Sequence, residues 1–311
     1  MSSPVAPVLE TPYENLGRQI RGPRALTDDW SRFWHLTYNI ARNEFKLRFF
    51  GSALGYLWQL VRPLLLFGVL YVFFVVISHV GKGGGPGEAH YGAQLLASII
   101  LFTFFAEATA GAVRSVVDRE NLVRKIQFPR MVIPLSVVLL ALFNLALNMI
   151  VVLGFALLEG VHPSLSWLEI PLLVAMLAVL ATGVAMLLSA LFVRFRDVQP
   201  IWDVSSQILF YASPTIVPLE RVREKLTTEH LADGGTVQHH HDLLLHIYYL
   251  NPLVTVMQQF RHAVIDHHAL SAGQALGGWG SLALPLAIVA GIFALGFWYF
   301  NRAAPSVAEN L

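Results

Sequence analysis

Long apolar stretches dominate the hydrophobic pattern along the chain. A helix needs roughly 20 mostly apolar residues to cross the hydrocarbon core of a bilayer. Six stretches reach or approach that length, and they predict six transmembrane helices at 57–79, 93–113, 131–158, 168–193, 201–217 and 282–300. The fifth stretch is the weakest, because Ser205, Gln207 and Pro214 interrupt its apolar run.

A different pattern precedes the first span. Apolar residues recur at spacings of three and four, which is one face of an α-helix. This face comprises Trp30, Phe33, Trp34, Tyr38, Ala41, Phe45 and Phe49, and basic or amide residues fill the opposite face. The pattern is typical of an amphipathic helix in the headgroup plane, here 30–50; the alternative is a helix packed on a soluble domain. Gly51 and Gly55 then predict either a close helix contact or a bend into the first span.

Composition agrees with a membrane protein. The 311 residues are 55% hydrophobic and 13% charged, whereas soluble domains average about 25% charged residues. The absence of cysteine excludes disulfides and thiolate chemistry. Residues 1–29 are polar and lack the apolar core of a cleavable signal, so we expect a flexible cytoplasmic tail followed, from 51 to 311, by the membrane domain.

The distribution of basic residues predicts the orientation. Sixteen of the 21 lysines and arginines fall before the apolar core of the first span, between spans two and three, between spans four and five, or after span six. Cytoplasmic loops carry the excess of Lys and Arg. We therefore expect a multi-pass protein of the plasma (inner) membrane with both termini in the cytoplasm. We also expect a long outer loop at 218–281.

The cytoplasmic loop after span two contains a charged, helix-competent segment at about 118–128. Asp118 is a candidate N-cap, and Leu122, Val123 and Ile126 form a small apolar ridge at helical spacing. A short rigid helix with such a ridge suits docking on a partner; the alternative is a solvated loop whose basic residues only set topology. The candidate docking residues are Asp118, Glu120, Asn121, Leu122, Val123, Arg124, Lys125, Ile126 and Phe128.

Four segments resemble a known family. They are RNEFKLRFFGSALGYLWQLVRP (42–63), ENLVRKIQFPRMVIP (120–134), Arg196-Asp197 with Ser213-Pro214, and LNPLVTVMQQFR (250–261). In their order and spacing, from about residue 30 to 300, they resemble the permease subunits of ABC-2 type exporters, in the branch that exports O-antigen, teichoic acid and other cell-surface polysaccharides. The His-rich insert at 221–246 departs from the family pattern.

The resemblance implies an all-α integral membrane protein that forms a homodimer of six-span subunits. It implies that segment 118–128 is a coupling helix on a separate ATPase, present in two copies, which binds the ATP and Mg²⁺. It also implies short re-entrant helices at 250–264 near the outer mouth, where Asn251, Pro252 and Arg261 are candidate gate residues. The expected substrate is a lipid-linked glycan or teichoic-acid-like polymer; the alternative is a small drug-like or lipid substrate.

A path for such a polymer needs aromatic faces that stack on sugar rings. The candidates are Tyr56, Trp58, Phe102, Phe104, Phe105, Trp202, Phe210 and Tyr211, and the alternative for each is packing or contact with lipid. Glu107 is an intramembrane carboxylate, which is costly and faces protein or water. Glu107 is a further candidate for the path, and we expect it to lie at a dimer seam, to pair with Arg114, or to act in a proton relay. Asn144 and Asn148 predict interhelical hydrogen bonds.

The sequence shows no site for enzymatic chemistry. The Gly-rich stretch at 81–87 lacks the spacing of a phosphate loop, and no nucleophile–base pair is evident. A membrane-bound transferase would need an acidic metal-binding cluster, for which Asp118, Glu120 and Asp197 are too isolated. A proton-coupled carrier would need more intramembrane charge than Glu107. His239, His240, His241 and Asp242 carry zinc-ligand chemistry, but consecutive histidines favour a solvated loop, so we expect no metal and no directly bound cofactor.

Overall fold

The computed structural model describes residues 30–48, 55, 57–79, 90–120, 129–230, 236–238, 248 and 251–303. Within these residues, five helical segments are long and apolar enough to cross a membrane: Leu57–Ile77, Tyr91–Asp118, Val132–Leu158, Leu165–Arg194 and Ala283–Ala303. They coincide with five of the six predicted spans. The chain is therefore a helical multi-pass membrane protein, as its hydrophobic pattern predicts.

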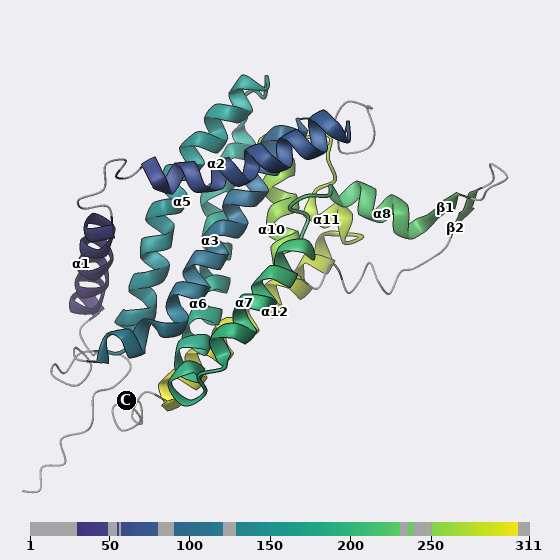
Figure 1. Ribbon diagram of the computed structural model, residues 1–311. Coiled ribbons are helices and arrows are strands. Elements are labelled where there is room, and N and C mark those ends of the chain that lie inside the picture. Colours follow the sequence, from purple (N-terminus) through teal and green to yellow (C-terminus); the bar gives the residue numbers. More distant parts are fainter. Residues whose placement is uncertain are drawn as a thin grey trace, which may run out of the picture.

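Three helices form the centre of the bundle: α3 (Tyr91–Asp118), α5 (Val132–Leu158) and α6 (Ile170–Arg194), which follows the 3-10 turn η3 (Leu165–Glu169) (Figure 1). α3 and α5 run antiparallel. The N–H of Ala93 at the start of α3 donates to Glu159 at the end of α5 at 3.0 Å. At the other end, Arg119 donates to the carbonyl of Ile133 at 3.4 Å. Most side chains of α3 are buried, so this helix is the core of the bundle.

The last helix, α12 (Ala283–Ala303), packs closely on α6. A Cβ added to Gly296 would lie 2.1 Å from the carbonyl oxygen of Gly183, so the two backbones meet where both residues are glycine. Further along, Val193 of α6 and Phe300 of α12 share one hydrophobic cluster. The two helices therefore run parallel, and the residues between them must return the chain from one end of the bundle to the other.

Part of this return is α7 (Val198–Tyr211). Its 14 residues make a helix about 21 Å long, shorter than the ~30 Å hydrocarbon core. Turns follow at residues 212–215, where Pro214 disfavours helical geometry at Ser213. The fifth predicted span is thus a shorter helix followed by turns, and the count of six spans stays a prediction.

The amphipathic segment is α1 (Trp30–Arg48), which packs on α5 rather than on a soluble domain. Phe33, Thr37 and Ala41 are buried at a spacing of four residues, whereas Trp30 and Trp34 of the same predicted face stay 61% and 43% exposed. The expected single aromatic face is therefore divided into a packed stripe and an exposed stripe. The headgroup position of this helix stays a prediction.

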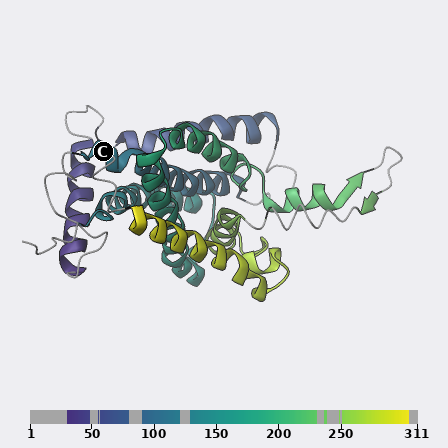
Figure 2. The same cartoon turned by 90° about the horizontal axis from the view of Figure 1, so that it is seen from below.

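The first span consists of α2 (Leu57–Tyr71) and the π-helical turn η2 (Val72–Ile77), and it crosses over the central helices (Figures 1 and 2). Only Gln59, Pro63 and Phe67 of α2 are buried, and they lie on one helical face because they are four residues apart. Gly55 stands in a turn before α2 with φ of 48°, a left-handed conformation that glycine adopts freely. This geometry favours the predicted bend; Gly51 lies outside the described residues.

The long segment between α7 and α12 contains short elements. They are α8 (Leu219–Thr227), β1 (Thr228–His230), β2 (Thr236–Gln238), α10 (Pro252–Phe260), η4 (Arg261–Ile265), α11 (Ala272–Ala275) and η5 (Trp279–Leu282). The antiparallel pair β1–β2 is a short ribbon in an otherwise helical structure, and the all-α fold class is confirmed. α10 and η4 coincide with the predicted re-entrant helices and are buried in the main core, but their insertion into a membrane stays a prediction.

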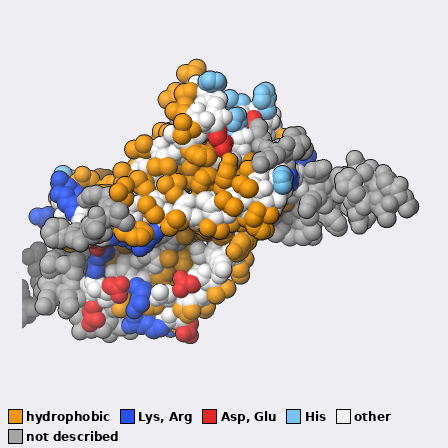
Figure 3. Space-filling view, turned by 45° about the horizontal axis from the view of Figure 1, so that its top comes forward, with side chains coloured by type: hydrophobic (Ala, Val, Ile, Leu, Met, Phe, Trp, Pro, Cys, Tyr) orange, Lys and Arg blue, Asp and Glu red, His pale blue; other side chains and the backbone are white. Residues whose placement is uncertain are grey.

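The distribution of hydrophobic and charged side chains on the surface is consistent with a membrane protein. Figure 3 shows a broad hydrophobic surface with charged side chains gathered below it and histidines above it. Arg114, Arg119, Arg130, Arg194 and Arg302 all lie near the ends of α3, α6 and α12 or the start of α5. We call this end of the bundle the basic end. The opposite end carries α10 and the start of α3.

Candidate functional site

Inside the bundle, Glu107 of α3 forms a polar junction with three other side chains. Its carboxylate is 26% exposed. Glu107 lies eleven residues before the end of α3, which is about 16 Å along the helix axis. The junction is therefore well inside the bundle rather than at its basic end.

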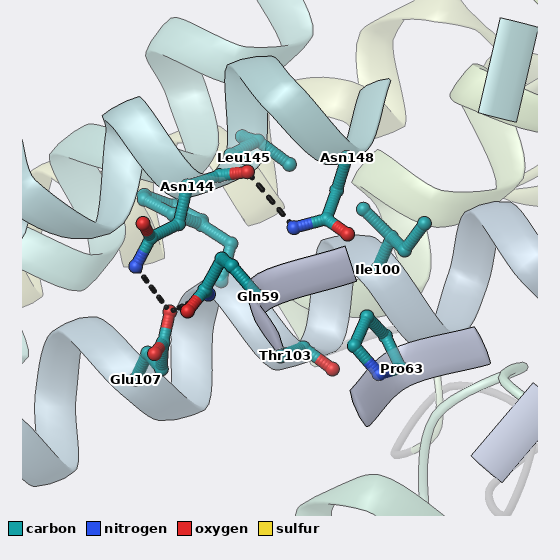
Figure 4. Close-up of a pocket in the computed structure, with 9 residues that line it drawn as sticks. Gln59, Pro63, Ile100, Thr103, Glu107, Asn144, Leu145 and Asn148 are labelled. Atoms are coloured by element: carbon teal, nitrogen blue, oxygen red, sulfur yellow. Dashed lines mark hydrogen bonds between the residues drawn. The ribbon is translucent and has the colours of Figure 1, made fainter. Parts of the chain in front are cut away.

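Both carboxylate oxygens of Glu107 are hydrogen-bonded, and Figure 4 shows the two bonds from Gln59 and Asn144. Oε1 accepts from Nη1 of Arg48, the last residue of α1, at 3.1 Å. Oε2 accepts from Nε2 of Gln59 in α2 at 3.2 Å and from Nδ2 of Asn144 in α5 at 3.0 Å. One carboxylate thus joins four helices.

The pairing of Glu107 differs in part from the sequence prediction. We expected Arg114 as a partner, but the guanidinium of Arg114 lies 3.9 Å from Asp118, one turn along the same exposed helix end. Arg48 takes its place, because packing of α1 on α5 brings the end of α1 to α3. The predicted interhelical bond of Asn144 is confirmed, whereas Nδ2 of Asn148 donates to the backbone oxygen of Asn144 in its own helix at 2.9 Å.

The junction also contains a cavity of about 10 Å³, lined by Gln59, Pro63, Thr103, Glu107 and Asn148 among others. Such a volume is close to the space that one water molecule needs. The Oδ1 atom of Asn144 is buried without a hydrogen-bond partner. The arrangement suits a polar anchor that holds α1 and α2 on the bundle, because α2 has only three inward-facing residues and Gln59 is one of them.

A second polar network lies at the opposite end, around Arg261. Its side chain is 3% exposed and its guanidinium donates from Nη1 to Oε2 of Glu220 at the start of α8. Oε1 of Glu220 accepts from Nε2 of Gln258 at 3.2 Å and from the N–H of Leu270 at 3.3 Å. Asp266 contributes an oxygen 4.0 Å from Nη2 of Arg261. A buried ion pair therefore ties α8 to η4.

The other two predicted gate residues form the start of α10. Asn251 is its N-cap: Oδ1 accepts from the N–H of Leu253 at 3.0 Å, and Nδ2 donates to Oγ of Ser213 at 3.1 Å. Pro252 follows at the first helical position, where its missing N–H costs nothing. The structure thus brings Asn251, Pro252 and Arg261 into one short buried element, while their action as a gate stays a prediction.

This element is also fixed to the rest of the bundle. Nε1 of Trp167 donates to the backbone oxygen of Val264 at 3.2 Å, and Nε2 of Gln259 donates to Oε2 of Glu169 at 2.7 Å. The hydroxyl of Tyr91 donates to the backbone oxygen of Ile216 at 2.6 Å. The contacts of Trp167 and Gln259 hold α10 and η4 on η3, and the contact of Tyr91 holds the turns after α7 at the same end.

At the basic end, Arg119 pairs with Glu44 of α1. Burial lowers the pKa of Arg119 below its usual value, and likewise that of Arg130. Asp118 is the last residue of α3 and not the start of a separate helix, which corrects its predicted capping role. Glu120 is described, but the remaining docking candidates, Asn121, Leu122, Val123, Arg124, Lys125, Ile126 and Phe128, lie outside the described residues.

The candidate path residues fall into different environments. Phe102 and Phe105 are buried, and their rings contact Phe210 and Trp202 of α7 with centroids 5.0 and 6.2 Å apart. Phe104 is also buried. Trp58 and Tyr211 are 42% and 67% exposed, and Tyr56 lies outside the described residues. Among the described candidates, Trp58 and Tyr211 are the most exposed, and Trp202 and Phe210 are partly exposed.

Comparison with known proteins places the chain in a family. A family model described as ABC-2 type transporter matches residues 35–227. Two proteins named O-antigen export system permease protein RfbA, from Klebsiella pneumoniae, are 27% and 28% identical over 189 residues, which are 60% of this chain and 71% of each relative. A protein of the same name from Myxococcus xanthus is 25% identical over 232 residues, 75% of this chain and 81% of the relative. The chain belongs to the ABC-2 type transporter family, as the four sequence segments predict.

Family membership makes the chain a membrane component of a transporter. Among the described residues, no group of three or more His, Cys, Asp or Glu side chains is placed to hold a metal ion. Sequence reasoning found Glu107, Asn144 and Arg261 but missed their partners Arg48, Gln59 and Glu220. Gln59 carried a signal, since it is a polar residue on the buried face of a span; Glu220, in a charged loop, carried none.

Proposed function

We propose that this chain is the permease subunit of an ATP-driven exporter that moves a lipid-linked cell-surface polysaccharide, or a teichoic-acid-like polymer, across the plasma membrane. The observation that carries the proposal is the match of residues 35–227 to the ABC-2 transporter model, together with relatives named as O-antigen export permeases. The chain crosses the membrane six times, with α7 and the turns after it as the shortest crossing, and both termini are cytoplasmic.

The exposed face of α7 supports a homodimer. Asp203, Gln207 and Tyr211 are exposed and four residues apart, so they form one stripe along the helix. A charged side chain facing lipid is costly, and the stripe therefore faces a second copy or the polymer path between the copies. Tyr211 supplies an aromatic face on that path.

Energy comes from ATP hydrolysis by a nucleotide-binding subunit, and membership of the ABC-2 type transporter family supports such a partner. Segment 118–128 docks on this subunit through the ridge of Leu122 and Ile126, and closure of two ATPase subunits displaces the two coupling helices. The polar junction at Glu107 transmits this displacement to α1 and α2, since it joins them to α3.

The test is coupling between hydrolysis and export in the double variant Leu122→Ser/Ile126→Ser. The expected result is that ATP hydrolysis by the partner no longer drives export, while the permease still inserts as a dimer. A matched control is Leu57→Ser/Leu66→Ser, which changes two exposed residues of α2 away from the docking ridge. Unchanged coupling in the ridge variant would contradict the assignment, and export of only small drug-like or lipid molecules would favour the alternative substrate.

A further inference from the structure

A long apolar groove lies on the bundle away from the polar junction. Its volume is about 550 Å³, within the range of ~300–1,000 Å³ typical of ligand sites. α5 and α6 form its floor, α12 one wall and the first turns of α1 its rim, at Trp30 and Trp34. The family match and the proposed function do not involve this face.

The groove is as long as one leaflet of a bilayer. On α5 it extends from Met131 to Leu142, eleven residues that rise about 16 Å. Half of the hydrocarbon core measures roughly 15 Å. Since α5, α6 and α12 are all spans, the groove begins at the basic end of the bundle and ends near the middle of the membrane.

The walls of the groove contain almost no polar atoms. Every residue that lines it is apolar or aromatic except Thr182, and the hydroxyl of Thr182 donates to the backbone oxygen of Ala178 at 2.7 Å within its own helix. The side chains that line the groove therefore require no hydrogen bond from a bound ligand. A sugar or a phosphate would lose its hydration here without a hydrogen bond in return.

The rim has the opposite character. Trp30 and Trp34 are both exposed, and tryptophan favours the boundary between hydrocarbon and headgroups. Arg194 and Arg302 end α6 and α12 at the same end and are exposed. Basic side chains at this level attract the anionic headgroups of phospholipids.

We propose that the groove binds one acyl chain of an anionic bilayer phospholipid, with its headgroup at the basic end beside Trp30 and Trp34. This ligand fits four features of the groove: its length of one leaflet, its apolar walls, its tryptophan rim and its position at the basic end. The lipid fills the space between α1 and α12 and so packs α1 on the bundle.

The experiment uses the full chain in vesicles of phosphatidylethanolamine and phosphatidylglycerol. A small fraction of the phosphatidylglycerol carries a photoreactive diazirine in the middle of one acyl chain. After illumination, adducts are mapped by peptide mass spectrometry. The expected result is an excess of adducts at 135–142 and 178–186 over exposed positions of the same helices outside the groove, such as Ile150 and Leu172.

Groove-filling variants distinguish a bound chain from general contact with lipid. Leu139→Trp should reduce the groove adducts to the level found outside the groove. Val179→Trp should do the same at a position that is already 40% exposed and therefore not needed for core packing. The matched controls are Ile150→Trp on α5 and Leu172→Trp on α6, which should leave the groove adducts unchanged.

The proposal would be overturned by adducts that spread evenly along α5 and α6, or by groove adducts that survive both filling variants. Cross-links that show the groove occupied by a second copy or by residues of the same chain would also overturn it. A photoreactive polyprenyl phosphate that labels the groove in preference to phosphatidylglycerol would assign it to a different lipid and would also overturn it.

Discussion

Arg48, the last residue of α1, donates a hydrogen bond to Glu107 in the middle of α3 at 3.1 Å, across 59 residues of sequence. The pair joins the amphipathic helix to the bundle core, as the pair of Arg119 with Glu44 does nearer the basic end. Arg48 is 45% exposed, so the ion pair alone contributes only ~0–1 kcal/mol. The importance of Glu107 lies in its three donors from three helices.

Glu107→Ala should therefore destabilise the protein by about 1–3 kcal/mol, because Gln59 and Asn144 lose their acceptor inside the bundle. Glu107→Gln keeps an acceptor and should have a smaller effect. Thermal unfolding in detergent micelles measures both. The control is Asp118→Ala, which removes an exposed pair with Arg114 and should change stability little; equal effects of Glu107→Ala and Asp118→Ala would contradict the role of the junction.

Arg261→Met should be among the most destabilising single changes, by about 3–5 kcal/mol, because Glu220 would stay buried without its cation. The double variant Arg261→Met/Glu220→Leu should cost less than the single one, since it removes both charges. A double-mutant cycle of unfolding free energies checks this relation. Strictly additive effects would show that the two side chains do not interact.

Gly296→Ala should separate α12 from α6. Its Cβ would lie 2.1 Å from the backbone oxygen of Gly183, and overpacking against backbone costs about 1–3 kcal/mol or more. Gly291→Ala is the control on the same helix, because its Cβ would meet nothing within 4 Å; alanine there should stabilise the helix by ~0.5–1 kcal/mol. A similar melting temperature for the two variants would refute the close contact.

Glu159 follows α5 at the end opposite the basic one. Burial raises the pKa of its carboxyl, opposed by the N–H of Ala93 and by the charge of His90. A raised acid pKa means that the folded state prefers the protonated form, so this group contributes stability at low pH that is lost as pH rises through its folded pKa. Glu159→Gln should therefore raise the melting temperature at pH 7 and lose that advantage near pH 4. A variant that is less stable than the parent at pH 7 would contradict this sign.

The sequence predicts the bundle well because membrane helices follow from uninterrupted apolar length. It underestimates the length of α3, which is predicted as 93–113 but observed as Tyr91–Asp118. The last turn of this helix contains the charged residues Arg114 and Asp118, so the hydrophobic pattern ends before the helix does. It overestimates the fifth span as one helix, because hydropathy does not register the turn at Pro214.

The sites are predicted only in part, for a physical reason. Glu107 and Arg261 are conspicuous as charges among apolar residues, but their partners depend on where distant helices pack. The contact of Arg48 with Glu107 requires α1 to lie on α5 through Phe33, Thr37 and Ala41. Residue spacing within α1 predicts an apolar face but not the helix that covers it.

The most direct test of the account is ATP hydrolysis by the complex of this chain with a nucleotide-binding subunit, reconstituted in vesicles. We predict that a lipid-linked polysaccharide stimulates hydrolysis and reaches the opposite side of the membrane only when ATP is present, whereas a small drug-like molecule does neither. Failure of any nucleotide-binding subunit to copurify, or stimulation by the small molecule alone, would contradict the assignment of this chain as a polysaccharide-export permease.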